Sequence, residues 1–155
     1  MKVIDVLQPT LTRANLEGRS KKTTIEKLAR VFAKQLPEID GDTLFSNFIS
    51  RERLGSTGFG DGVAIPHCRL PGLRKIHAAL ITLSEPVEFD AADDQPVDIL
   101  FALIVPEEKN EEHLKTLSAI ASLLSNTETR TLLRECESDA ALYQRVIDSD
   151  GVLPQ

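Results

Sequence analysis

The hydrophobic positions in the first third of the chain repeat at the spacing of an α-helix. One apolar stripe starts near Ser20 and is closed by Pro37. A second stripe runs to about Leu54, with Asp40 or Asp42 ahead of it as a candidate N-terminal cap. The pattern therefore predicts two successive amphipathic helices.

Three apolar runs in the middle of the chain have the length of a β-strand. They cover residues 63–65, 76–83 and 97–105, and Pro106 closes the last one. Such continuous runs are typical of strands that are covered on both faces. The sequence therefore predicts a sheet that lies between two layers of other structure.

Helical spacing returns in the last third of the chain. One helix is expected to begin near Asn110, and two shorter ones to cover about 127–136 and 138–148. Helices thus precede and follow the strands, so we expect an α/β domain with a mixed sheet between helices. The length of 155 residues fits one domain spanning residues 1–155.

Charge and cysteine usage exclude several function classes. The net charge is −6 and no dense basic cluster is present, so we expect no nucleic-acid partner. The apolar runs are too short for membrane insertion, and the N-terminus lacks an apolar signal region. The spacing of Cys68 and Cys136 fits neither a zinc motif nor a disulfide framework. These features favour a cytoplasmic protein.

The segment from Gly55 to His67 holds the strongest candidate chemistry. Four glycines fall between Gly55 and Gly62, which argues against an ordinary helix or strand there. The spacing matches neither a P-loop nor a dinucleotide-binding fingerprint. Glycine backbone can offer N–H groups to an anion, and Pro66 would present His67 at a rigid strand end. A neutral imidazole placed in this way is a candidate nucleophile, although an ordinary loop histidine is the simpler alternative.

Two further residues are candidates for the same site. His113 falls in the first turn of a predicted helix, where an anion and an uncharged imidazole are both favoured. Arg51 lies at the end of a helix just before the glycines and is suited to pair with phosphoryl oxygens. The alternatives are a partly buried structural histidine and a solvated surface charge. His77 has no companion feature and is interpreted as structural, and we predict neither a metal nor a cofactor.

These residues carry a resemblance to a known family. Arg51-Glu-Arg, followed by Gly-Ser-Thr-Gly-Phe-Gly-Asp-Gly-Val-Ala-Ile-Pro-His67, resembles the active-site segment of the mannitol/fructose-type enzyme IIA of the phosphoenolpyruvate-dependent phosphotransferase system. Residues 94–106 are similar to the central strand of that family, and residues 112–118 are similar to the segment that bears its second histidine. The Ser56-Thr57 pair makes the chain most similar to the nitrogen-related branch, IIA-Ntr.

The resemblance implies a fold and a reaction. The fold would be a three-layer α/β/α sandwich with a mixed central sheet, as in mannitol-type enzyme IIA. His67 would accept a phosphoryl group from the phosphohistidine of HPr, or of its relative NPr, so the chain would be a phosphotransferase component. His113 would stabilise that group, and phosphate contacts are expected from Arg51, Ser56, Thr57, Gly58 and Gly60.

Two departures from the family and several alternatives stay open. Cys68 stands where the family often has glycine, and Asp61, where asparagine is common, would weaken phosphate affinity. The chain could instead be a regulatory binding module, a stand-alone sugar-specific IIA that serves a IIB component, or a domain related to anion transporters. Regulatory target proteins are further expected partners.

Overall fold

A mixed β-sheet forms the middle layer of the protein, for which the computed structural model describes residues 2–108 and 110–150. The strands run in the order β1-β5-β6-β3-β2, and β4 also pairs with β6. β1 is parallel to β5, β5 is antiparallel to β6, and both β3 and β4 are parallel to β6. The bounds are β1 Leu7–Leu16, β2 Gly58–Gly60, β3 Val63–Ala64, β4 His67–Arg69, β5 His77–Val87 and β6 Val97–Val105.

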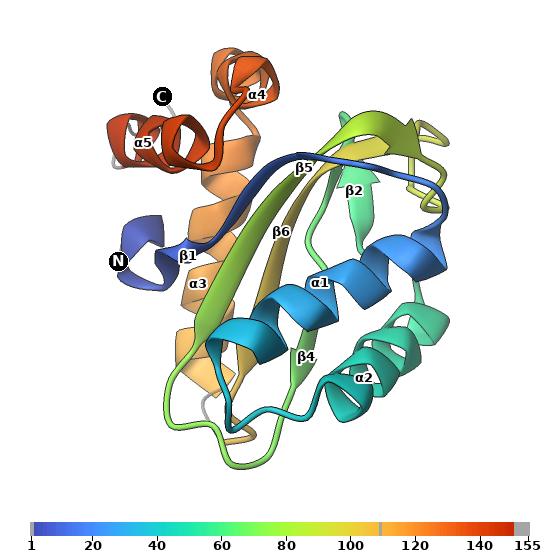
Figure 1. Ribbon diagram of the computed structural model, residues 1–155, viewed down its shortest axis with the longest axis vertical. Coiled ribbons are helices and arrows are strands. Elements are labelled where there is room, and N and C mark those ends of the chain that lie inside the picture. Colours follow the sequence, from blue (N-terminus) through green and yellow to red (C-terminus); the bar gives the residue numbers. More distant parts are fainter. Residues whose placement is uncertain (1, 109, 151–155) are drawn as a thin grey trace.

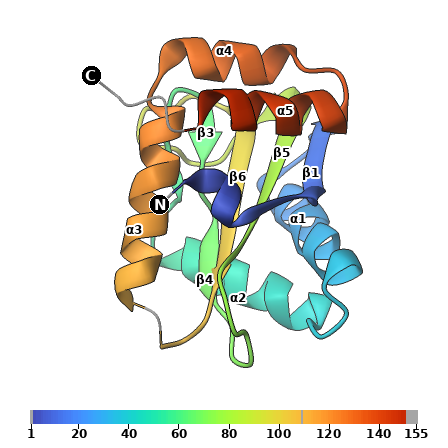
Figure 2. The ribbon, with the colours of Figure 1, turned by 90° about the vertical axis from the view of Figure 1, so that its left-hand side faces the viewer.

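Helices cover both faces of this sheet (Figures 1 and 2). The first face carries α1 (Lys21–Gln35) and α2 (Gly41–Leu54). The second carries α3 (Asn110–Leu124), α4 (Thr127–Glu135), α5 (Asp139–Ser149) and the 3₁₀ turn η1 (Val3–Asp5). The buried hydrophobic side chains accordingly form two clusters, one on each face of the sheet. The expected three-layer α/β/α sandwich with a mixed sheet is confirmed.

Side-chain caps fix the starts of α1, α2, α4 and α5, and the cap of α4 is Asn126. Ser20 accepts a hydrogen bond from the backbone N–H of Thr23 at the start of α1. Asp40, rather than Asp42, caps α2, and Ser138 caps α5. Each cap satisfies a backbone donor that has no partner within its helix, so these polar residues set where the helices begin.

The N-terminal strand β1 was not expected from the sequence. Its outer positions are polar, and it contains Pro9, which cannot donate to a ladder and therefore suits an edge strand. Leu11 and Thr12 are nevertheless fully buried. Pairing with β5, rather than a local hydrophobic pattern, makes this segment a strand.

The glycine-rich segment was predicted to contain no strand, and this prediction is wrong for Gly58–Gly60. These residues form β2, which pairs with β3 in a tight hairpin. The turn is Asp61-Gly62, with φ of 59° and 79°. Both are positive, as in the two-residue hairpin turns that Asp-Gly favours.

His67 begins β4 instead of ending the preceding strand. Pro66 has no N–H and interrupts the edge that pairs with β6, separating β3 from β4. The Pro66 carbonyl still accepts from the N–H of Leu103 at 2.9 Å. This break turns the chain at His67 while β6 holds both sides of it.

Across the described part of the chain, no helix combines the length and the apolar character needed to cross a membrane.

Candidate active site

His67 lies half-buried at the first position of β4, and the backbone carbonyl of a nearby residue fixes the orientation of its imidazole ring. Its Nδ1 is 2.8 Å from the carbonyl oxygen of Ile65. A carbonyl oxygen only accepts, so Nδ1 must carry the proton and donate it. The other nitrogen, Nε2, is therefore left with a free electron pair.

His113 brings a second imidazole beside the first. It lies in the first turn of α3, and the two ring centroids are 5.5 Å apart with an edge-to-face angle of 65°. Within residues 2–108 and 110–150, its Nε2 is the buried side-chain nitrogen or oxygen that has no hydrogen-bond partner. Because buried polar atoms are normally paired, this nitrogen is well placed to meet a ligand.

Burial keeps both imidazoles uncharged near neutral pH. It is the main cause that lowers the pKa of His67, and Arg51 lowers it further, while the Ile65 carbonyl and Glu52 act in the opposite direction. Burial likewise lowers the pKa of His113, with smaller contributions from His67 and Arg69. An uncharged His67 retains the electron pair that a nucleophile needs.

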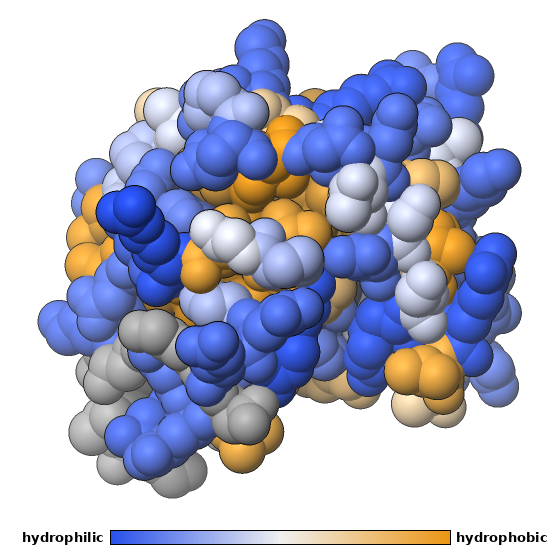
Figure 3. Space-filling view, turned by 90° about the horizontal axis from the view of Figure 1, so that it is seen from below, coloured by the Kyte–Doolittle hydropathy of each residue, from blue (hydrophilic) through white to orange (hydrophobic). Residues whose placement is uncertain are grey.

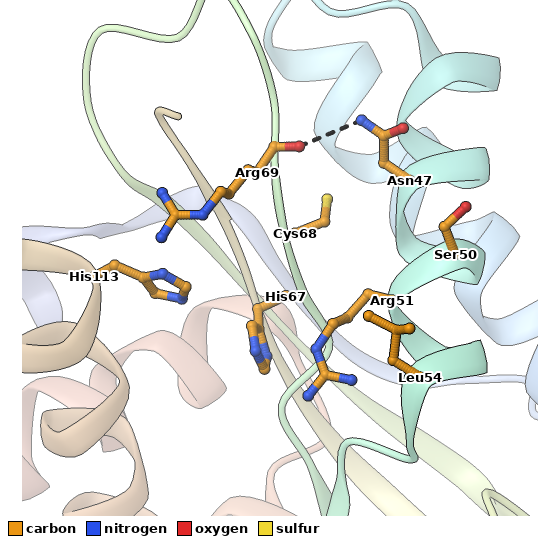
Figure 4. A pocket seen from close by; sticks show the side chains of 8 residues that line it. All are labelled: Asn47, Ser50, Arg51, Leu54, His67, Cys68, Arg69 and His113. Atoms are coloured by element: carbon orange, nitrogen blue, oxygen red, sulfur yellow. Dashed lines mark hydrogen bonds between the residues drawn. The ribbon is translucent and has the colours of Figure 1, made fainter. Parts of the chain in front are cut away.

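Two arginines flank the histidines (Figure 4). Arg51, in the last turn of α2, donates from Nη1 to the carbonyl oxygen of Gly55 at 2.9 Å. Arg69 follows His67 by two positions in β4 and donates from Nη1 to the carbonyl oxygen of Glu107 at 2.7 Å. Both guanidinium groups are held close to the rings by backbone carbonyls. Planar guanidinium groups in this position suit an anion with several oxygens.

These side chains share one open pocket of about 460 Å³, here called the histidine pocket. His67, His113 and Arg51 were predicted as site residues, and the structure brings all three together. Sequence reasoning missed Arg69 and the polar face of α2, although the strand period of two and the helical spacing would have pointed to them. The lining residues are Asn47, Ser50, Arg51, Leu54, His67, Cys68, Arg69 and His113.

Exposed apolar side chains lie beside the pocket. Leu54, at its edge, is 84% exposed, and Leu114, next to His113, is 64% exposed. Viewed from below, the molecule has a mainly hydrophilic face, with hydrophobic residues gathered near its hollowed centre and at its margin (Figure 3). The combination suits contact with another protein's surface.

The glycine-rich segment does not line the histidine pocket. Ser56 Oγ donates to the carbonyl oxygen of Phe89 at 2.6 Å and accepts from the N–H of Gly58 at 3.0 Å. Thr57 donates through both N and Oγ1 to the Glu52 carboxylate. Gly60 lies in β2. Ser56 and Thr57 therefore tie the segment to Phe89 and to Glu52 of α2, which gives the segment a fixed shape next to the site.

Cys68 and Asp61, the two residues that differ from those usual in the resembled family, lie in different parts of the structure. Cys68 lines the pocket but is buried. Burial raises the pKa of its thiol to about 12, so the side chain is uncharged and contributes packing only. Asp61 is not among the pocket residues. Its carbonyl accepts from Arg134, and its carboxylate lies 3.9 Å from Arg130, so its charge faces these arginines. His77 is buried at the start of β5, also away from the pocket residues.

A metal centre has no evident ligand set in the part of the chain that is described, since no three His, Cys, Asp or Glu side chains are grouped there.

An uncharged imidazole beside a second histidine and two arginines, on an α/β sandwich, defines a protein that can hold an anionic group on a histidine. The chain belongs to the family described as "Phosphoenolpyruvate-dependent sugar phosphotransferase system, EIIA 2", whose model matches residues 5–149.

The comparisons with individual proteins agree with this assignment. The chain is 48% identical to a nitrogen regulatory protein of Pseudomonas aeruginosa, over 92% of this chain and 93% of that protein. It is 39% identical to a nitrogen regulatory protein of Escherichia coli, over 97% of this chain and 93% of that protein. The structure of nitrogen regulatory protein IIA-Ntr from Neisseria meningitidis matches with a TM-score of 0.85 and 34% identity, over 92% and 97% of the two chains. The resemblance to the nitrogen-related branch of this family is thereby confirmed.

Proposed function

We propose that this chain is a phosphocarrier of the phosphotransferase system, in which Nε2 of His67 accepts a phosphoryl group from the phosphohistidine of an HPr- or NPr-type carrier. The observation that carries the proposal is the orientation of the His67 ring, with Nδ1 bound to Ile65 and Nε2 left as the nucleophile. Membership of the EIIA 2 family supports it.

The proposed transfer needs few chemical groups. Nε2 of His67 attacks phosphorus as the carrier's phosphorus–nitrogen bond breaks, and the carrier's nitrogen keeps the electron pair of that bond. Little bond chemistry is left for other side chains, so positioning and charge stabilisation dominate. We assign the stabilising role to the Nε2–H of His113 and to the guanidinium groups of Arg51 and Arg69. No metal or nucleotide enters the scheme.

The carrier protein is proposed to dock on the face around the histidine pocket. The exposed Leu54 and Leu114 would provide apolar contacts, and the arginines would meet the phosphoryl group. In Escherichia coli, a mannitol enzyme IIA with this fold has been solved in complex with phosphorylated IIB. A IIB component therefore remains an alternative partner for this chain.

We further propose that the phosphorylated and free forms act in regulation, in the cytoplasm, and that residues 1–155 form one EIIA type-2 domain. The relatives named nitrogen regulatory protein support this use, since they are matched over nearly their whole length. A phosphoryl group on an interface changes its charge and hydrogen bonding, so it can select partners. The fructose-specific EIIABC component of Bacillus subtilis is 29% identical to this chain, which spans 24% of it, and this keeps a sugar-specific IIA as the second candidate.

Intact-protein mass spectrometry tests the proposal. The chain is incubated with phosphoenolpyruvate, enzyme I and either HPr or NPr, beside His67→Ala and the matched control His77→Gln, which changes a histidine outside the pocket. We expect one added, acid-labile phosphoryl group in the parent and the control and none in His67→Ala. An unmodified parent, with both carriers shown to be charged, would leave only a binding module.

Adding purified IIB components to the charged protein separates the two candidate uses. Rapid loss of the phosphoryl group to a fructose- or mannitol-type IIB would favour the sugar-specific candidate. Retention of the group would favour regulation.

A further inference from the structure

Glu52 follows Arg51 in α2, yet its carboxylate turns away from solvent. The side chain is 5% exposed and lies between Lys21, at the start of α1, and Thr57 of the glycine-rich segment. A buried carboxylate is costly unless it is paired and hydrogen-bonded, so its neighbours explain why it stays there.

Both oxygens of this carboxylate are occupied. Oε1 accepts from the N–H of Thr57 at 3.1 Å and is 3.0 Å from Nζ of Lys21, the first residue of α1. Oε2 accepts from the Thr57 hydroxyl. Lys21 is itself held in place by Phe89. Its Nζ donates to the backbone carbonyl oxygen of Phe89 and lies 4.8 Å from the centre of the Phe89 ring. Glu52 therefore holds Thr57 by two hydrogen bonds, and Lys21 holds Glu52 in place.

A chain of hydrogen bonds runs from Thr57 to the nucleophile. The carbonyl oxygen of Thr57 accepts from the N–H of Ile65 at 3.0 Å. The carbonyl oxygen of Ile65 in turn accepts from Nδ1 of His67 at 2.8 Å. Glu52 therefore holds Thr57, Thr57 holds Ile65, and the carbonyl oxygen of Ile65 sets the tautomer of His67.

We propose that Glu52 is a positioning residue of the phosphoryl-accepting site, acting through Thr57 and Ile65 to hold His67 with Nδ1 as donor and Nε2 facing the pocket. The inference rests on the proposed role of His67 as acceptor. Glu52 itself does not line the pocket and touches no reacting atom.

The charge of Glu52 supports the same role. Arg51 on α2 lowers the pKa of His67 beyond the effect of burial, whereas Glu52 raises it. Among the described residues that line the pocket with His67, the other charged or titratable groups are Cys68 and Arg69 of β4 and His113 of α3. The Glu52 carboxylate thus acts against the lowering of the His67 pKa by burial and by Arg51.

Two variants separate the effect of the Glu52 hydrogen bonds on the position of His67 from the effect of the Glu52 charge. Glu52→Gln keeps atoms that can bind Thr57 but removes the charge. The double variant Lys21→Met/Glu52→Met removes both partners, and replacing a buried ion pair by apolar side chains of similar size is often tolerated. Glu26→Gln is the matched control, since Glu26 forms an exposed pair with Arg30 on α1.

¹⁵N NMR of the imidazole groups gives the tautomer and the pKa of His67 without any phosphoryl transfer. We expect a lower His67 pKa with the Nδ1–H tautomer retained in Glu52→Gln, and a mixture of tautomers in the double variant. Phosphoryl acceptance should fall about tenfold or more in the double variant with an unchanged KM for the carrier, because a small misplacement of a nucleophile is costly. Glu26→Gln should match the parent.

The proposal is overturned if the double variant folds and keeps both the parent tautomer and the parent rate. If that variant does not fold, Glu52→Ala decides, because it removes both hydrogen bonds to Thr57, and the parent tautomer together with the parent rate in Glu52→Ala overturns the role. A parent chain that accepts no phosphoryl group would instead contradict the proposed function. The NMR measurement of the His67 tautomer does not depend on phosphoryl transfer, so the two failures can be told apart.

Discussion

Replacing His113 by leucine should make the protein more stable and less active. His113 is 9% exposed, and its buried Nε2 has no partner in the described residues. A buried polar atom without a hydrogen bond costs about 1–3 kcal/mol. Leucine has a similar volume and would extend the apolar stripe that continues at Leu117 and Ile120. We expect the free energy of unfolding to rise by about 1 kcal/mol at pH 7.5, since part of the cost is offset by lost contacts.

The gain in stability should be larger in mild acid. Burial lowers the pKa of His113, so the unfolded chain binds a proton more readily than the folded one. The parent therefore loses stability as the pH falls below the unfolded pKa of about 6.5, and leucine removes this part of the loss. Urea unfolding at pH 7.5 and pH 5.0 measures both effects.

The same substitution should slow phosphoryl acceptance about a hundredfold, in line with the removal of one donor to a developing anion. Rapid-quench sampling with a charged carrier gives this rate. A His113→Leu protein that is less stable than the parent at both pH values and accepts phosphate at the parent rate would refute the reasoning.

Three further predictions address Arg51 in the histidine pocket and the stability of the fold. Arg51→Lys should accept phosphate about tenfold more slowly, because an ammonium cannot form the paired bonds of a guanidinium; quench measurements beside a melting curve separate this from misfolding. Gly18→Ala should destabilise by about 1–3 kcal/mol in urea unfolding, since its Cβ would lie 2.5 Å from the carbonyl oxygen of Glu85, and no loss would contradict that contact. Hydrogen bonds from the side chain and backbone of Thr43 lower the pKa of Asp40. Asp40→Ala should therefore be less stable than the parent at pH 6, with a difference that shrinks as the folded Asp40 is protonated; a constant difference would contradict this.

The fold was predictable where local pattern and tertiary packing agree. The helices α1 and α2 and the strand β6 carry strong apolar periodicity or a continuous apolar run, and all three were expected. β1 was missed because its hydrogen bonds come from β5, far along the chain, and its sequence contains a proline. β2 was missed although the Asp61-Gly62 turn is a hairpin signal, because the glycines around it suggested a loop.

The site was predictable in its chemistry more than in its shape. His67, His113 and Arg51 meet in one pocket, as their types and positions suggested. The amides of Thr57 and Gly58 were expected to contact phosphate, but they bind Glu52 and Ser56. Which partner a loop amide finds depends on side chains brought in by the fold, and the spacing of glycines does not reveal it.

The central claim is that Nε2 of His67 takes the phosphoryl group. ³¹P and ¹⁵N NMR of the phosphorylated chain test it most directly, because they identify both the residue and the ring nitrogen. The account predicts a single phosphohistidine at His67 with phosphorus on Nε2 and the proton on Nδ1, as the bond to Ile65 requires. Phosphorus on Nδ1 of His67, or on any other residue, would contradict it.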